Sequence, residues 1–155
     1  MPFSLVPDRL FEDYAAVTPA LLRELGVTLL LSDLDFTLAA KATRRPDQAL
    51  KDYIAALQGA GIGFMIVSNN RSGTRVTEFC ADLGVPYQGR AGKPSPQGIF
   101  AAIRRADGSV DHTAMLGDKL LTDCLAAKRA GVLALTVEPP FGADHFLAIA
   151  SPKPM

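Results

Sequence analysis

Residues 27–37 read VTLLLSDLDFT, an apolar run that stops abruptly at two aspartates. The run is short and almost wholly apolar, which is typical of a parallel strand that is covered on both faces. Aspartate favours turns, so we expect the strand to end before Asp33. Ligands of doubly wound sheets bind beyond the carboxyl ends of the strands, so this stretch predicts a fold and also the position of a site.

Comparable strand signals recur along the chain and alternate with helix signals. Apolar runs predict five strands, at 27–32, 62–67, 85–87, 113–116 and 132–137. Pro86 cannot donate a ladder hydrogen bond, which places its strand at an edge of the sheet. Capping residues, prolines and apolar spacing predict helices that begin near Thr18-Pro19, Pro46, Arg75, Ser95-Pro96 and Leu121. The alternation predicts an α/β fold, a doubly wound parallel sheet of about five strands with helices on both faces.

Length and composition limit the possible classes of protein. The chain has 155 residues, so we expect one domain over 1–155, with a core at about 18–138 and terminal segments packed on it. A hydrophobic share of 48% excludes global disorder. Sixteen basic and sixteen acidic residues give a net charge of zero, which lacks the basic footprint of a nucleic-acid-binding protein.

Several features favour a cytoplasmic location. No apolar run reaches the roughly 18 residues that span a bilayer, and residues 1–8 lack the basic start of a secretory signal. Cys80 and Cys124 have no metal-binding spacing, and we interpret both as buried, reduced thiols. Phe3, Leu5, Val6, Leu10, Phe11, Tyr14, Phe146 and Leu147 form apolar terminal groups that would suit peripheral contact with the inner membrane face or burial of a sheet edge.

Polar residues that follow the predicted strands should gather at one edge of the sheet. They are Asp33, Asp35, Ser68, Asn69, Lys93, Asp118 and Asp123. Asp33 and Asp35 are two positions apart and are expected to project to the same side of an extended chain. Oxygen ligands without histidine or cysteine favour a hard cation such as Mg²⁺, with Asp33 and Asp118 as the natural ligands. A carboxylate beside Mg²⁺ can attack phosphorus, and Ser68 and Lys93 would hold the phosphoryl oxygens.

The spacing Asp33-x-Asp35-x-Thr37, Ser68, Lys93 and Gly117-Asp118-x-x-x-x-Asp123 resembles the four ordered motifs of the haloacid dehalogenase (HAD) phosphatase superfamily. The resemblance extends to its IIIA-type YqeG family, which is similar to the mitochondrial phosphatidylglycerophosphate phosphatases. It is carried by residues 67–70, Arg75-Val76, Lys93-Pro94 and residues 117–123, and it covers about residues 5–138. It implies an HAD-like fold and a Mg²⁺-dependent phosphomonoester phosphatase that works through an aspartyl-phosphate.

The resemblance also implies a role for each matching residue. Asp33 would be the nucleophile and Asp35 the general acid and base, with the Asp35 backbone carbonyl on Mg²⁺. Asp118 would ligate the metal, while Asp123 would hold its water shell or orient Lys93. The remaining roles are stabilisation of the transferring group by Lys93, phosphate binding by Ser68 and Asn69, and support of the loop by Thr37. Phe36 and Lys119 depart from the common family pattern and are expected to bear on substrate choice.

Other interpretations of the same residues stay open at this point. Asp123 would also suit a helix N-terminus, where a negative charge is favourable. Arg71 and Arg75 are interpreted as solvated charges at a helix start, with contact to the substrate as the alternative. A receiver-type phosphoacceptor domain also combines clustered aspartates, Mg²⁺ and lysine. In a receiver-type domain the acceptor aspartate follows the third strand. This chain has Gln88-Gly89 at that place and no aspartate, which argues against the receiver-type interpretation. An inactive HAD scaffold is the third interpretation.

The chain has no room for a sizeable cap domain after Asp35 or Ser68, which predicts an open site. Such a site suits a bulky substrate such as a lipid headgroup or a macromolecule, and phosphatidylglycerophosphate is the substrate that the resemblance implies. The expected partner is a phosphorylated small molecule or a lipid headgroup. It would also suit closure by a neighbouring copy in a homo-oligomer.

Overall fold

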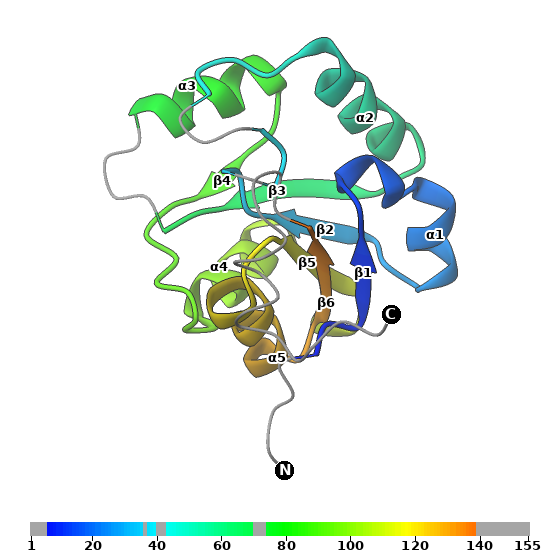
Figure 1. The fold of residues 1–155 in the computed structure, drawn as a ribbon, viewed down its shortest axis with the longest axis vertical. Coiled ribbons are helices and arrows are strands. Elements are labelled where there is room, and N and C mark those ends of the chain that lie inside the picture. Colours follow the sequence, from blue (N-terminus) through cyan, green and yellow to red (C-terminus); the bar gives the residue numbers. More distant parts are fainter. Residues whose placement is uncertain (1–5, 36, 40–42, 70–73, 139–155) are drawn as a thin grey trace.

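The computed structural model describes residues 6–35, 37–39, 43–69 and 74–138, which form a sheet between two layers of helices (Figure 1). The strands are β1 (Arg9–Phe11), β2 (Leu29–Ser32), β3 (Gly63–Val67), β4 (Tyr87–Gln88), β5 (Thr113–Gly117) and β6 (Leu133–Val137). The α-helices are α1 (Pro19–Glu24), α2 (Gln48–Gly59), α3 (Thr74–Leu83), α4 (Gln97–Arg105) and α5 (Leu125–Ala130). Two 3₁₀ turns, Tyr14–Ala16 and Val110–His112, and a π-helical turn, Leu120–Cys124, complete the described elements.

The six strands are all parallel, in the order β1-β6-β5-β2-β3-β4. β2 lies at the centre, where Leu30 pairs with Phe64 of β3 on one side and with Ala114 of β5 on the other. Every residue of β2 is buried, in keeping with its three consecutive leucines before Ser32. The carboxyl ends of β2, β3 and β5 therefore lie side by side and define the edge that carries the polar residues.

The predicted doubly wound parallel sheet is confirmed, with one strand more than expected. All five predicted strands are present, and β4 lies at the edge of the sheet as the position of Pro86 predicted. β1 was not predicted, because its three residues are exposed or half-buried and show no apolar run. Its pairing with β6 accounts for it, with Leu10 opposite Thr136.

Alternate residues of the strands supply two separate cores. Leu30 and Ile66 face α1, α2 and α3, where the fully buried Phe79 of α3 packs. Leu31 and Met65 face the opposite layer, α4 and α5 (Figure 1). α1 has the predicted cap, since Thr18 accepts a hydrogen bond from the Leu21 amide. α2 begins after Pro46, and Asp47 is its cap, accepting from the Leu50 amide. α4 begins at Gln97 with Pro96 in the N-cap position, so proline is not its first helical residue, contrary to the prediction.

The intervals that could have carried a cap domain are short. They are residues 33–47 between β2 and α2, and residues 68–73 between β3 and α3. No helix within the described residues is long and apolar enough to cross a membrane. Of the predicted apolar terminal group, Val6 and Leu10 are exposed, whereas Phe11 and Tyr14 pack against the core. Phe3, Leu5, Phe146 and Leu147 lie outside the described residues.

Gly98 allows α4 to approach the segment that leads to Lys93. A Cβ atom at this position would overlap the Cα and Cβ atoms of Ala91. Both residues are buried. The close contact therefore holds the main chain just before Lys93 against α4.

Gly98→Ala is expected to push α4 away from Ala91 and to lower the free energy of unfolding by about 1–3 kcal/mol. Gly59→Ala is the matched control, because a Cβ at Gly59 meets nothing within 4 Å and alanine is the better helix former. Chemical denaturation of the three proteins checks the prediction. Equal stability of Gly98→Ala and wild type would contradict it.

Candidate active site

Lys93 lies at the centre of the polar edge, with a side chain that is only 3% exposed. Its ammonium group donates to Asp123 Oδ1 at 2.6 Å, to the Val67 carbonyl at 3.0 Å and to Asp33 Oδ1 at 3.2 Å. Burial lowers the pKa of this lysine, but Asp33 and Asp123 raise it more, and the net shift is upward. Lys93 is therefore a permanent cation, stabilised by two carboxylates that come from separate parts of the chain.

The π-helical turn after β5 carries Asp123 to Lys93. Asp123 is 2% exposed, and its second carboxylate oxygen accepts a hydrogen bond from the Lys119 amide at 3.3 Å. The absence of a side chain at Gly117 makes room, since a Cβ there would overlap the Asp123 carboxylate. Asp123 is thus a buried partner of Lys93. It also lies in the first turn of the π-helical segment, as the alternative of a negative charge at a helix start requires, so the two interpretations describe the same residue.

Asp118 follows β5 directly and lies beside Asp33. It is 5% exposed, and Thr37 donates a hydrogen bond to its Oδ1 atom at 3.4 Å. Burial, together with the neighbouring Asp33 and Asp123, raises the pKa of Asp118 to about 6, and the exposed Lys119 opposes the rise. Burial and Asp123 likewise raise the pKa of Asp33 to about 6, against the attraction of Lys93. Both shifts reflect carboxylates crowded into a space shielded from water.

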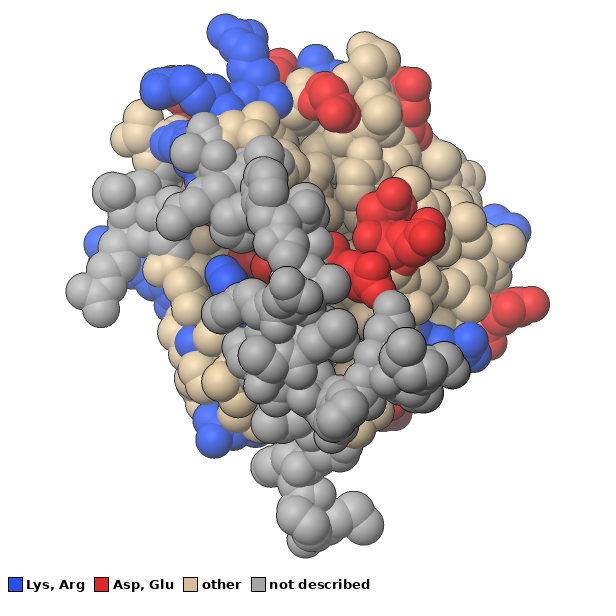
Figure 2. Space-filling view, in the orientation of Figure 1, with Lys and Arg blue, Asp and Glu red and all other residues tan. Residues whose placement is uncertain are grey.

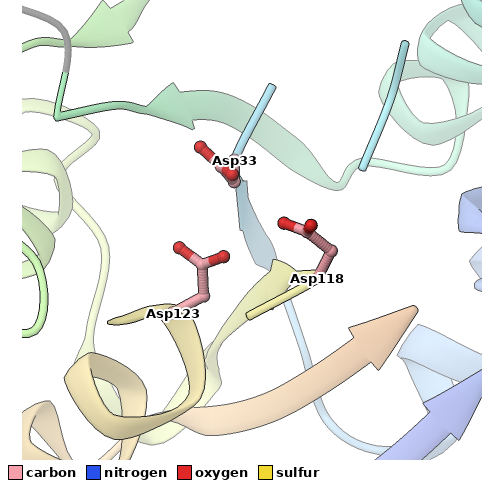
Figure 3. A group of neighbouring side chains, drawn as sticks. All are labelled: Asp33, Asp118 and Asp123. Atoms are coloured by element: carbon pink, nitrogen blue, oxygen red, sulfur yellow. The ribbon is translucent and has the colours of Figure 1, made fainter. Parts of the chain in front are cut away.

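Asp33, Asp118 and Asp123 point into one space at the ends of β2 and β5 (Figure 3). One carboxylate oxygen from each residue lies within 4.8 Å of the other two. Acidic side chains are also visible near the middle of the face in Figure 2. Three carboxylates against the single buried ammonium of Lys93 leave two negative charges uncompensated. A hard divalent cation fits this set of oxygen donors and this excess charge.

Asp35 has a different partner from the one that its spacing suggested. The carboxylate group that could hold a metal among the described residues consists of Asp33, Asp118 and Asp123, without Asp35. Both oxygens of Asp35 instead accept hydrogen bonds from Arg75 Nη2, at 2.9 and 2.8 Å. The interpretation of Arg75 as a solvated charge was therefore wrong. The partner of Arg75, Asp35, lies 40 residues earlier in the chain. The residues around the start of α3, on which the sequence interpretation rested, give no sign of this contact.

The two residues expected to bind phosphate lie after β3. Ser68 is buried, and its backbone amide donates to the Gln88 carbonyl. The side-chain amide of Asn69 bonds the Lys93 backbone twice, accepting from its amide nitrogen at 2.8 Å and donating to its carbonyl at 3.1 Å. Asn69 therefore braces the loop that carries Lys93. Phe36 and Arg71 lie outside the described residues.

A parallel α/β sheet with a lysine and three carboxylates at its carboxyl edge is typical of phosphoryl-transfer proteins. A family model described as haloacid dehalogenase-like hydrolase matches residues 7–131. The chain is also 31% identical to "Probable phosphatase YqeG" of Bacillus subtilis over 142 residues, which are 92% of this chain and 82% of that protein. The chain therefore belongs to the haloacid dehalogenase-like hydrolases, and it is a phosphoric monoester hydrolase.

Solved structures share the fold at low sequence identity. The cobalt-bound deoxy-D-mannose-octulosonate 8-phosphate phosphatase of Haemophilus influenzae is 18% identical with a TM-score of 0.61, covering 78% of this chain and 75% of that one. The corresponding phosphatase of Moraxella catarrhalis, in complex with magnesium, phosphate and KDO, is 16% identical with a TM-score of 0.52 and coverages of 77% and 82%. The HAD resemblance, the predicted fold and the enzyme class are confirmed, and the receiver-type interpretation loses its support.

Asp118→Asn removes one crowded charge, and its effect on stability is expected to depend on pH. A folded-state pKa of about 6 lies above the ordinary value of 3.8, so wild type loses stability as pH rises from about 4 to about 6. The variant escapes this loss. We expect its free energy of unfolding to exceed that of wild type by about 1–2 kcal/mol at pH 7 in EDTA, and by less at pH 4.

Addition of Mg²⁺ at pH 7 is expected to reverse this order, since wild type offers the complete set of carboxylates and binding stabilises the folded state. Denaturant titrations of both proteins, with EDTA and with Mg²⁺, measure the effect. An order that Mg²⁺ leaves unchanged would argue against a metal site in this cluster.

Proposed function

We propose that this chain hydrolyses phosphomonoesters in a Mg²⁺-dependent reaction with an aspartyl-phosphate on Asp33. The observation that carries the proposal is the buried Lys93 ammonium, 3.2 Å from Asp33 and 2.6 Å from Asp123, beside a group of carboxylates suited to a divalent cation. Asp33 and Asp118 would hold Mg²⁺, with Asp35 contributing its backbone carbonyl and Asp123 the water shell. Bound Mg²⁺ supplies the positive charge that lets an anionic nucleophile approach a phosphate.

The reaction divides into two displacements at phosphorus. In the first, an Asp33 oxygen attacks phosphorus, the bond to the ester oxygen breaks, and the Asp35 carboxyl group donates its proton to that leaving oxygen. In the second, a water molecule attacks the same phosphorus and gives a proton to Asp35. The bond between phosphorus and Asp33 then breaks, which releases inorganic phosphate and restores both carboxyl groups.

The other polar residues would bind and position the phosphoryl group. Ser68 would bind the phosphate from its place directly after Val67, whose carbonyl accepts a hydrogen bond from Lys93. Lys93 would donate to the phosphoryl oxygens that gain charge in the transition state. The Asn69 side chain forms two hydrogen bonds with the Lys93 backbone. Asn69 would therefore also help to orient the Lys93 side chain toward the phosphate. Thr37 would orient Asp118, to which it donates a hydrogen bond.

Phosphatidylglycerophosphate is the substrate that we propose to test first. The support comes from the family resemblance and from the short intervals 33–47 and 68–73, which leave no length for a cap domain over the site. A site without a cap accommodates a phosphate on a bulky group such as a lipid headgroup. Contact with a membrane surface or with a second copy of the chain would be compatible with this arrangement.

Asp33→Asn is expected to reduce Mg²⁺-dependent phosphate release by at least about 10³-fold while the fold persists, because the amide cannot attack phosphorus. Asp82→Asn is the control, since it replaces an aspartate of α3 that pairs only loosely with Lys51 at 3.8 Å. Phosphate release and circular dichroism are measured for both variants. Turnover that survives in Asp33→Asn would refute the nucleophile assignment.

A panel of phosphatidylglycerophosphate, sugar phosphates, nucleotides and phosphopeptides, each with Mg²⁺ and with EDTA, tests the substrate. We expect the highest kcat/KM with phosphatidylglycerophosphate and loss of release in EDTA. A higher value for a soluble phosphate would reject the lipid substrate. Absence of release from every compound, and from p-nitrophenyl phosphate, would instead favour the inactive scaffold.

A further inference from the structure

Asp35 is held by a contact outside the carboxylate group that the metal would occupy. Its two oxygens accept hydrogen bonds from one nitrogen of Arg75, at 2.9 and 2.8 Å. The side chains are partly exposed, 30% for Asp35 and 21% for Arg75. An ion pair at such exposure contributes little to stability. The main effect of this ion pair is on geometry and not on stability. It fixes the direction of the Asp35 carboxylate, three positions after the end of β2.

Arg75 is itself well anchored. Its second terminal nitrogen, Nη1, donates to the Thr43 carbonyl at 2.7 Å. Its backbone belongs to the first turn of α3, which buries Val76 and Phe79 in the core beside it. A guanidinium group presents its donors in a rigid planar fork. Arg75 therefore ties two points of the 33–47 interval, Asp35 and Thr43, to a helix that packs on the sheet.

Asp35 needs such a support for a chemical reason. It lies two residues from Asp33, so a mobile carboxylate at this position could turn toward the cation that Asp33 and Asp118 would hold. A proton donor is effective only when its oxygen lies within hydrogen-bond distance of the leaving group, and misplacement by about 1 Å can cost 10²-fold in rate.

We propose that Arg75 is the positioning residue for Asp35, holding its carboxyl group out of the metal cluster and toward the leaving oxygen of the substrate. The inference rests on the proposed function, in which Asp35 donates the proton to that oxygen. In this role Arg75 acts through Asp35, both oxygens of which accept hydrogen bonds from its Nη2 atom.

The dependence on the leaving group tests this role. The p-nitrophenolate ion leaves without a proton, whereas the alkoxide of glycerol 3-phosphate requires one. Arg75→Gln is therefore expected to lower kcat with glycerol 3-phosphate by about 10- to 100-fold, to change kcat with p-nitrophenyl phosphate by less than about 3-fold, and to leave KM for both nearly unchanged. Arg75→Lys, which retains a donor for Asp35, is expected to recover part of the loss.

Two further variants complete the design. Asp35→Asn is expected to show the same leaving-group dependence, and the double variant with Arg75→Gln should be no slower than Asp35→Asn, because the two residues act as a unit. Arg105→Gln is the matched control. Arg105 also joins a helix to a neighbouring backbone, through the Tyr87 carbonyl at 2.6 Å, but lies at the end of α4.

Each outcome decides between the assignments. Equal kcat losses for both substrates in Arg75→Gln and Arg75→Lys, with an intact fold by circular dichroism, would overturn the positioning role. A rise in KM alone would overturn it in favour of direct binding of the substrate anion by Arg75. If Asp35→Asn itself shows no leaving-group dependence, the proton-donor role of Asp35 fails, and the inference for Arg75 fails with it.

Discussion

The site depends on one buried ammonium group. Lys93 has almost no access to water, so its charge must be stabilised by partners, and two of these are carboxylates, Asp33 and Asp123. These partners come from the end of β2 and from the turn after β5, while Lys93 comes from the loop before α4. One cation therefore holds together three segments that are far apart in sequence, and it fixes the positions of the carboxylates around it.

Several uncharged details serve this arrangement. Asn69 holds the Lys93 backbone through both ends of its amide, and Gly98 lets α4 pack directly on Ala91. Gly117 leaves the space that the Asp123 side chain fills. Gly98, Gly117 and Asn69 therefore each constrain a different segment around Lys93. Together they keep the lysine close to its carboxylate partners.

The sequence predicts most of the fold because the central strands are buried on both faces and show this as continuous apolar runs. It also predicts the convergence of Asp33, Lys93, Asp118 and Asp123, since strand ends of a parallel sheet meet at one edge. The π-helical turn is not predictable in the same way, because its residues are compatible with an ordinary α-helix. The partner of Arg75 was missed for a related reason, since the direction of the Asp35 side chain is decided by tertiary contacts and not by its spacing from Asp33.

The position of β1 has a consequence for the order in which the protein is built. Within the part of the chain that the structure describes, Arg9–Phe11 pairs only with β6, and Leu10 lies opposite Thr136. During synthesis β1 therefore has no strand of the described sheet to pair with until β6 has been translated. The other five strands can assemble before it docks, which makes β1 the last of the six described strands to join the sheet.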